Sequence, residues 1–397
     1  MNKLNVLVLS FYYKPDLCAG SFRTTSLVEE LKAKLPPDAR IHVITSMPNR
    51  YHSHNVAAAE NEEDGIVRIT RIPIPAHKSG MLGQVRSFFV YFMGVLKILR
   101  KQKYDLVYAT SSRLFTAFLG AIASKQQKAP VYMDIRDIFV DTIGDVMPKK
   151  WSKFFLPVLS GIEKFTFSSA ARINLVSPGF LPYFQKDYSG EKFDFFTNGI
   201  DAVFLDAREK MDRNAVSGEG KKTVLYAGNI GEGQGLEKII PDLARAVEEQ
   251  YDFIVIGDGG RRKVLEEELN RQGVKNVTLM NPVTRQELIN YYQKADILFL
   301  HLNAHNAFLK VLPSKVFEYA ALGKPLLAGV SGYAKSFIES EIDNAAVFHP
   351  CDYQQAITAL SKIKYSFEPR ADFIAKYDRA AIMKKLSDSV LAVAGRL

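Results

Sequence analysis

Short apolar runs rich in β-branched residues alternate with helix-length segments along the whole chain. Runs without polar alternation are typical of strands buried on both faces, and intervening helices predict parallel pairing. In the first half these runs are residues 4–10, 41–45, 67–72, 105–110, 130–135 and 172–176. The rhythm restarts at 223–228 and continues through 252–257, 276–280, 295–300 and 324–329. The pattern therefore predicts an α/β fold with two Rossmann-like, doubly wound parallel sheets.

A polar stretch without an apolar period, residues 206–222, separates the two sets of strands. The length of 397 residues also favours two domains over one core. We expect an N-terminal domain over 1–205 and a C-terminal domain over 206–375, followed by a helix over 376–397 that can pack back on the first domain. Ligands of such paired domains bind in the cleft between them.

Composition is ordinary for a globular protein, with 47% hydrophobic and 24% charged residues, and it excludes disorder. The two cysteines, Cys18 and Cys351, lack metal-type spacing and indicate free thiols in a reducing compartment. The apolar run at the N-terminus is one strand long, so we expect no cleaved signal peptide. These features favour a cytoplasmic protein.

The formal charge of +9 indicates acidic partners such as phosphates, anionic lipid or nucleic acid. Two segments, 81–103 and 147–159, mix aromatic and aliphatic residues with basic ones, as segments that lie on an anionic membrane do. Arg86 and Lys97 make the first too charged to span a bilayer, and a core helix explains it equally well. Membrane contact is favoured for the second. No aromatic-basic module supports nucleic-acid binding.

Residues 312–325 predict a helix that begins after Pro313 and Ser314. Its N-terminus would offer free N–H groups to a phosphate, and Lys315 adds a full cation. Glu318, one turn on, would be repelled by phosphate unless it faced hydroxyls, so we interpret it as a ribose ligand of a nucleotide. A capped helix with an i, i+3 ion pair explains the same residues equally well.

A glycine-rich turn follows the strand at 223–228 and a second follows the strand at 252–257. The first contains Gly228, Asn229, Gly231, Gln234 and Gly235, and the second contains Gly257, Gly259, Gly260, Arg261 and Arg262. The first has neither the dinucleotide fingerprint nor a P-loop lysine. Together with Lys315, the two turns give three loops at the carboxyl edge of one sheet, each with amides or cations suited to a diphosphate.

Seven motifs in this order are together specific: residues 11–23, 134–137, 176–180, 198–201, 226–237, 256–262 and 312–325. In them the chain resembles family 4 glycosyltransferases of the GT-B fold, in particular bacterial enzymes that build O-antigen or capsule repeat units, including those that handle N-acetylated amino sugars. The resemblance implies a retaining transfer from a nucleotide diphosphate sugar, by analogy a UDP sugar. The implied acceptor is a polyprenyl-diphosphate-linked saccharide at the inner face of the cytoplasmic membrane.

The resemblance also implies roles for residues. Glu318 would bind ribose, Arg261 and Lys315 would neutralise the leaving diphosphate, and the loop 228–235 would hold phosphates and sugar. The implied donor ligands are Gly228, Asn229, Gly231, Gln234, Gly259, Arg261, Pro313, Ser314, Lys315 and Glu318. The sequence contains no D-x-D motif, so we expect no metal and no cofactor beyond the donor substrate.

The chain departs from the family pattern at three places. Lys310 stands where many members carry an acidic residue, and Gln234 stands where a lysine is common. No histidine occurs between His77 and His301, so we expect residues 133–137 to occupy the place of the usual donor-side histidine.

In the N-terminal half the resemblance implies an acceptor side formed by Gly20, Arg23, Asp134, Arg136 and Asp137. Asp137 would orient or deprotonate the acceptor hydroxyl. A pair with Arg136 or a helix cap explains Asp137 equally well. The leaving phosphate can itself take the proton, so no covalent nucleophile is assigned.

Three other classes share some of these features. A two-domain solute-binding protein would have the same layout, but it would carry an export signal. A nucleotide-sugar epimerase would place carboxylates and a histidine around the donor, which the histidine gap disfavours. A nicotinamide oxidoreductase would need a G-x-G-x-x-G turn after the first strand, and none is present.

Overall fold

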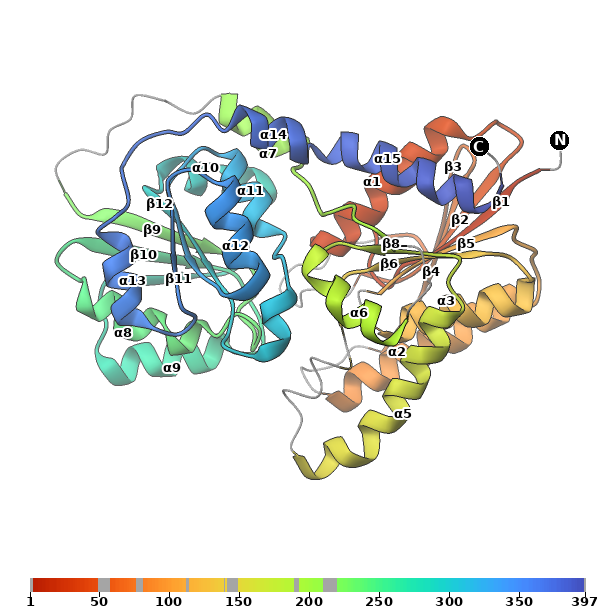
Figure 1. Ribbon diagram of the computed structural model, residues 1–397, viewed down its shortest axis with the longest axis horizontal. Helices are drawn as coiled ribbons and strands as arrows, with labels where there is room; N and C mark the ends of the chain where they lie inside the picture. The colour runs from red at the N-terminus through yellow and green to blue at the C-terminus, as the bar shows by residue number, and fades with distance from the viewer. Residues whose placement is uncertain are drawn as a thin grey trace. The chain divides into compact units, whose positions relative to one another are not determined.

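The protein is represented by a computed structural model that describes residues 3–48, 58–75, 81–111, 114–138, 140, 149–188, 193–209 and 220–395. It consists of two compact units (Figure 1). Unit 1 comprises Met1–Asn198 and Ala380–Leu397, and unit 2 comprises Gly199–Arg379. Each unit is a parallel sheet covered by helices, as the alternating pattern predicts.

The sheet of unit 1 has the strand order β3-β4-β2-β1-β5-β6-β7-β8. Its strands are β1 (Asn5–Leu9), β2 (Arg40–Ser46), β3 (Asn61–Asp64), β4 (Val67–Ile72), β5 (Leu106–Thr110), β6 (Val131–Ile135), β7 (Arg172–Leu175) and β8 (Phe193–Asp194). Among the residues described, β3 and β4 form its antiparallel pair, and the other neighbours are parallel. β5 and β6 are buried along their whole length, which explains their apolar runs.

Helices cover both faces of this sheet (Figure 1). They are α1 (Ala19–Lys34), α2 (Met81–Leu99), α3 (Leu114–Gln127), α5 (Lys149–Ser168), α6 (Leu181–Asp187) with η1 (Pro178–Phe180), and α15 (Arg379–Val393). α1 and α15 pack on one face, where Leu27 and Leu386 share a core with Val8 of β1. On the other face α3 lies so close to β5 that a Cβ on Gly120 would come within 2.4 Å of the Ala109 Cβ.

The sheet of unit 2 has the strand order β11-β10-β9-β12-β13-β14, with parallel pairs throughout its described residues. Its strands are β9 (Lys222–Ala227), β10 (Tyr251–Ile256), β11 (Val277–Met280), β12 (Ile297–His301), β13 (Leu326–Gly329) and β14 (Ala345–Phe348). Its helices are α7 (Ala202–Glu209), η2 (Leu236–Lys238), α8 (Ile240–Ala246), α9 (Arg262–Gln272), α10 (Arg285–Lys294), η3 (Asn306–Lys310), α11 (Lys315–Ala321), α12 (Gly332–Glu341), α13 (Tyr353–Leu360) and α14 (Ala371–Tyr377).

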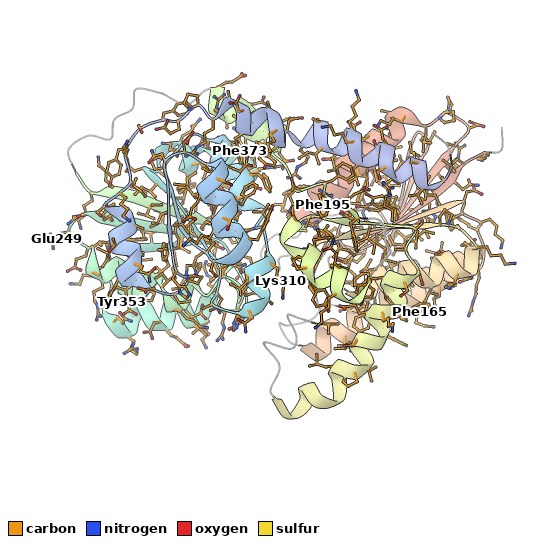
Figure 2. All side chains as sticks on the ribbon, in the orientation of Figure 1. Phe165, Phe195, Glu249, Lys310, Tyr353 and Phe373 are labelled. Carbon is orange, nitrogen blue, oxygen red and sulfur yellow. The ribbon has the colours of Figure 1, made fainter. Side chains whose placement is uncertain are left out.

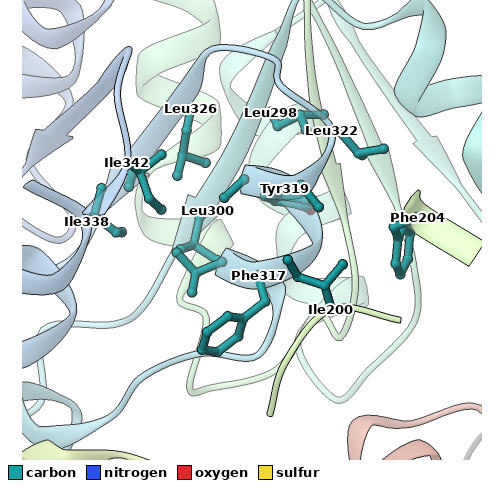
Figure 3. Close-up of a cluster of buried hydrophobic side chains, with 14 of the residues drawn as sticks. Ile200, Phe204, Leu298, Leu300, Phe317, Tyr319, Leu322, Leu326, Ile338 and Ile342 are labelled. Carbon is teal, nitrogen blue, oxygen red and sulfur yellow. The ribbon is translucent and has the colours of Figure 1, made fainter. Parts of the chain in front are cut away.

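Two apolar cores lie on the opposite faces of this second sheet. One joins α8, α9 and α13 to the strands. The other surrounds α11, where Phe317, Tyr319 and Leu322 pack against Leu298 and Leu300 of β12 (Figure 3). Of the seven residues of α11, six are buried, so this short helix is held by its packing rather than by its own hydrogen bonds.

The unit boundaries differ from those expected at residues 205 and 375. Ile200 already belongs to unit 2, because its N–H donates to the Tyr377 carbonyl at 2.8 Å and its side chain is fully buried there. Phe204 of α7 is buried in the same core, so α7 belongs to unit 2 and is not linker. Residues 210–219 of the expected linker lie outside the described residues. After Arg379 the chain returns to unit 1, where Met383 of α15 is fully buried.

Each strand expected from the apolar pattern is present, with ends within two residues of those predicted. The pattern missed β3, β8 and β14. β3 has the sequence NEED at the sheet edge, where solvent meets one side and apolar residues are not needed. β8 has two residues and β14 has four, too few for a periodic signal.

Candidate functional site

Three segments of unit 2 gather at the carboxyl edge of the second sheet. They are the glycine-rich loop 228–235 after β9, the turn 257–261 after β10, and the start of α11, which follows β12 and η3. Because the strands are parallel, the segments that leave their carboxyl ends emerge on one side of the sheet, where α/β proteins bind ligands. This is the grouping that the sequence predicts.

The first two segments touch through their backbones. The Ile230 N–H donates to the Asp258 carbonyl and the Arg261 N–H donates to the Ile230 carbonyl, both at 2.9 Å. A Cβ on Gly257 would lie 1.8 Å from the Gly228 carbonyl oxygen, and one on Gly259 would lie 2.4 Å from the Ile230 oxygen. Both glycines also have positive φ angles, of 153° and 156°. Only glycine allows this approach.

The third segment reaches the same loop through Lys315, the first residue of α11. A Cβ on Gly228 would lie 2.4 Å from the Lys315 Cε, so the lysine side chain lies directly across that glycine. Its Nζ is 3.8 Å from Glu318 Oε2, one turn along the helix. The Tyr319 hydroxyl accepts the Ala227 N–H at 3.1 Å and fixes α11 to the end of β9. The lysine and carboxylate are therefore paired beside the glycine-rich loop.

Arg261 reaches the other end of this loop. Its guanidinium forms an ion pair with Glu232 and lies 3.6 Å from Glu237. Lys238 and His305 lie 3.9 Å and 3.6 Å from the same Glu232 carboxylate. Burial alone would raise the pKa of the Glu232 carboxyl, but Arg261, Lys238 and His305 outweigh burial and hold that pKa below its usual range. Sequence reasoning assigned no role to Glu232, Glu237, Lys238 or His305, although the first three lie in or beside the loop it selected.

Asn229 and Gln234 shape the loop. The Asn229 Nδ2 donates to Gln234 Oε1 at 2.8 Å, and the Gly231 N–H donates to the same oxygen at 3.3 Å. The glutamine that replaces the family's lysine therefore braces the turn from inside. Pro313 and Ser314 precede α11 as expected, and the Ser314 side chain makes no capping hydrogen bond.

His301 at the end of β12 holds the glycine-rich loop through the backbone of Gln234. Its Nδ1 is 2.6 Å from the Gln234 carbonyl oxygen, and its Nε2 accepts the Cys351 N–H at 2.9 Å. This pair of bonds requires a neutral ring with its proton on Nδ1. Burial lowers the pKa of His301 to about 4, which keeps the ring neutral at ordinary pH.

In unit 1 the expected acceptor residues Arg23 and Asp134 need a correction. Both are fully buried, and they form a bidentate ion pair in which Arg23 Nε is 2.7 Å from Asp134 Oδ2. Asn174 donates to the same carboxylate at 2.6 Å. Burial alone would raise the pKa of Asp134, but Arg23, Arg136 and Asn174 hold it below its usual range. These two side chains join α1 to β6 and do not face an acceptor.

Arg136, Gly20 and Asp137 lie at the carboxyl edge of the first sheet. Arg136 Nη1 lies 3.0 Å from where a Cβ on Gly20 would stand, so the guanidinium crosses the first turn of α1. Its Nη2 donates to Asn198 at 3.4 Å, whereas its buried Nη1 has no hydrogen-bond partner among the described residues. Asp137 is exposed, whereas Met133 is fully buried in β6. Of the expected acceptor side, Arg136 and Asp137 are the charged groups near solvent.

Within the described ranges, no group of three His, Cys, Asp or Glu side chains is placed to hold a metal ion.

Comparison with known proteins gives a family match for unit 2. Residues 207–379 match the family Glycosyl transferases group 1. Through this segment the chain is similar to the group 1 glycosyl transferases. The matched region contains all three segments that meet at the second sheet.

Similar proteins extend the match over both units. The chain is 25% identical to "Putative colanic acid biosynthesis glycosyl transferase WcaI" of Escherichia coli (strain K12), over 84% of each chain. It is 22% identical to the 2-deoxystreptamine N-acetyl-D-glucosaminyltransferase of Niallia circulans, over 67% of this chain and 69% of that one. Anabaena HepE, solved with UDP and glucose, has a similar fold with a TM-score of 0.67 at 16% identity, over 98% and 100% of the two chains. The expected resemblance and GT-B fold are confirmed.

The backbone contact between the two glycine turns leads to a first prediction. Gly259→Ala should lower the free energy of unfolding by about 1–3 kcal/mol, because the new methyl meets the Ile230 carbonyl and φ is positive. Gly260→Ala is the matched control, since a Cβ there meets no atom within 4 Å. Urea denaturation of both variants measures the difference, and equal stabilities would contradict the prediction.

His301 leads to a second prediction. Its pKa is about 4 in the folded protein, against an ordinary value of 6.5 for a solvated histidine, so below pH 6.5 the unfolded chain binds a proton that the folded chain does not. The stability of the wild type should therefore fall by up to about 3 kcal/mol from this group as pH drops from 6.5 towards 4.

In His301→Asn this part of the pH dependence should disappear, leaving a flatter profile over the same range. His349 is exposed, so His349→Asn serves as the control and should keep the wild-type profile. Parallel profiles for wild type and His301→Asn would contradict the prediction, because they would show that His301 takes up its proton at the same pH in the folded and the unfolded protein.

Proposed function

We propose that this glycosyltransferase moves a sugar from a nucleotide diphosphate donor to a lipid-linked saccharide, with retention at the anomeric carbon. One observation carries the proposal. Lys315 and Arg261, from two separate segments, approach the same glycine-rich loop, where Lys315 lies across Gly228 and Arg261 meets Glu232. Cations and backbone turns gathered at one sheet edge suit a diphosphate group.

The chemistry of the reaction explains why such cations are needed. Breaking the bond between the anomeric carbon and phosphate builds negative charge on the leaving diphosphate, and fixed positive groups stabilise that charge. Lys315 and Arg261 take this part. Glu318 has 12% of its side chain exposed and lies beside Lys315, so it is placed to accept the ribose hydroxyls of the nucleotide. We assign catalysis to charge neutralisation and to no covalent residue.

The relatives support the finer assignments. HepE was solved with UDP, which favours uridine as the base. WcaI is named for colanic acid biosynthesis and the Niallia enzyme for N-acetylglucosaminyl transfer, which supports surface polysaccharide synthesis and an N-acetylated amino sugar here. The acceptor proposed is a polyprenyl-diphosphate-linked saccharide at the inner face of the cytoplasmic membrane.

Unit 1 supplies the acceptor side of the proposal. The exposed Asp137 is suited to orient or deprotonate the acceptor hydroxyl. Arg136 carries a buried N–H group that has no hydrogen-bond partner in the described part of the chain, which suits an oxygen of the acceptor. We propose further that transfer needs no divalent metal and no cofactor, because side-chain cations already stand where the diphosphate charge develops.

The membrane part of the proposal rests on α2 and α5 of unit 1. Val85, Phe89 and Met93 follow one another at every fourth position of α2 and are 59%, 62% and 49% exposed. Val158 and Phe165 of α5 are 60% and 41% exposed. Figure 2 labels Phe165. Large apolar side chains in a row on an open helix face mark a surface that another phase or molecule covers.

Aromatic contacts connect the two helices. Phe92 of α2 stacks on Phe118 of α3 at 6.4 Å, and Phe118 meets Phe165 of α5 edge-on at 5.8 Å. The opposite face of α2 is buried, with Tyr91 and Val95 fully covered. The core-helix interpretation of residues 81–103 therefore fits one face of α2, and we propose the membrane interpretation for its open face. Residues 147 and 148 of the second segment, and the side chains of 149–155, lie outside the described residues.

The positive charge of α2 and α5 favours an anionic bilayer as the partner of their exposed apolar side chains. α2 contains Arg86 and Lys97 and no acidic residue. The single acidic residue of α5, Glu163, is 3% exposed and accepts the Tyr183 hydroxyl at 2.6 Å. Cations beside exposed apolar side chains attract anionic lipid and then bury into the interface. None of the helices in the described residues is long and apolar enough to cross a bilayer.

The donor assignment is tested by thermal shift with UDP, GDP and TDP sugars. The UDP sugar should raise the melting temperature of the wild type most, and Glu318→Ala should lose most of that shift because the ribose hydroxyls lose their acceptor. Glu339→Ala, an exposed carboxylate of the same unit, is the control and should keep it. An unchanged shift in Glu318→Ala would refute the ribose assignment.

The membrane assignment is tested by co-sedimentation with vesicles of phosphatidylglycerol and phosphatidylcholine. Phe89→Glu should weaken binding by roughly tenfold, because it removes an apolar anchor and adds a charge that anionic lipid repels. Phe195→Glu changes an exposed phenylalanine of unit 1 outside both helices and should bind as the wild type does. Wild-type protein that remains in the supernatant with anionic vesicles would contradict the proposal.

A further inference from the structure

The carboxylate of Glu232 lies among positive and hydrogen-bonding groups from three other segments of unit 2. Arg261 comes from the turn after β10, Lys238 from η2, and His305 from the segment before η3. Asn303 Nδ2 adds a contact to the Glu232 Oε1 at 3.4 Å. The Glu232 carboxylate of the glycine-rich loop is therefore the common partner of these groups.

These cations are neutralised before any ligand arrives. Arg261 pairs with Glu232 and also lies 3.6 Å from Glu237, and Lys238 lies 3.9 Å from Glu232. Two cations therefore face two carboxylates. An anionic ligand that approaches Arg261 meets a repelling carboxylate, unless one of the two moves away.

Glu232 is the carboxylate that is free to move. A third of its side chain is exposed, at 34%, whereas the side chain of Glu237 is 7% exposed. Its neighbours in the sequence are Gly231 and Gly233, which carry no side chains that could block its rotation.

The backbone at the same place is held. Asn303 Nδ2 donates to the Glu232 carbonyl and the Asn303 N–H donates to the Gly233 carbonyl, at 2.8 Å and 2.9 Å. Rotation of the Glu232 side chain alone therefore uncovers Arg261 and Lys238 without opening the loop.

We propose that the Glu232 carboxylate occupies the binding position of the donor diphosphate until the donor binds. In the ligand-free protein its carboxylate holds Arg261 and Lys238 in position, and the diphosphate displaces it and takes over both cations. The negative charge of Glu232 then weakens donor binding and makes it a specificity-determining residue, since a ligand must outcompete a carboxylate to enter. This inference rests on the proposed function, because it assigns the displacing group to the donor.

The test is calorimetric titration of the full chain with UDP and, separately, with inorganic pyrophosphate. Glu232→Gln keeps the shape of the side chain and removes the charge. It should tighten UDP binding roughly two- to fivefold, the range expected for loss of a partly exposed ion pair that competes with the ligand. Pyrophosphate binding should tighten in the same sense, because the competition is for phosphate oxygens.

Two further variants show that the effect acts through Arg261. In the background of Arg261→Gln, Glu232→Gln should tighten UDP binding by a smaller factor, because one of the cations that it releases is missing. Glu249→Gln is the matched control, since Glu249 is exposed and lies just before β10, at the amino edge of the same sheet (Figure 2). It should leave UDP binding unchanged.

The outcomes separate this inference from the proposed function. If the wild type binds UDP clearly and Glu232→Gln binds it more weakly or equally, the displacement of Glu232 is wrong, whereas the proposed donor site is not contradicted. Equal tightening with and without Arg261 would also overturn it, because the effect would then be a general change of charge. A wild type that binds neither UDP nor pyrophosphate would overturn both.

Discussion

The candidate site depends on direct backbone contact between two turns at the carboxyl edge of the second sheet. Gly257 and Gly259 allow the turn after β10 to touch the carbonyl groups of Gly228 and Ile230, which no side chain would permit. Hydrogen bonds between the turns then fix Arg261 beside the glycine-rich loop. Pairing of β9 with β10 brings the two turns to the same edge, and the contact between the turns then fixes Arg261 relative to the loop.

Around this contact, some side chains hold the loop in place, whereas others are exposed enough to contact a ligand. His301 and the Asn229–Gln234 pair brace the loop through buried or internal hydrogen bonds. Lys315, Arg261 and Glu232 remain partly exposed, at 25%, 37% and 34% of their side chains. A rigid support that holds cations in place suits the proposed stabilisation of a departing diphosphate.

Unit 1 shows the same ionic chemistry used for a different purpose. Arg23 and Asp134 resemble site residues in the sequence, yet both are fully buried and form an ion pair inside unit 1. The exposed apolar face of α2, in contrast, resembles part of a core in the sequence, yet it lies open. In both cases the residue type alone did not predict whether the side chain is buried or exposed, because that depends on the elements that pack around it.

The sequence by itself determined every strand except β3, β8 and β14, the parallel pairing of the strands it predicted, and the three segments of the second sheet. Apolar periods and glycine turns are local signals, and burial on both faces of a sheet imposes the apolar runs. It also selected Lys315, Glu318 and Arg261, since residues that follow parallel strands meet at one edge. Only the tertiary structure decided that Arg23 is buried, that α15 closes the core of unit 1, and that Glu232 is the partner of Arg261. Such facts depend on which distant side chains come into contact, and no local pattern records the partner of a charge.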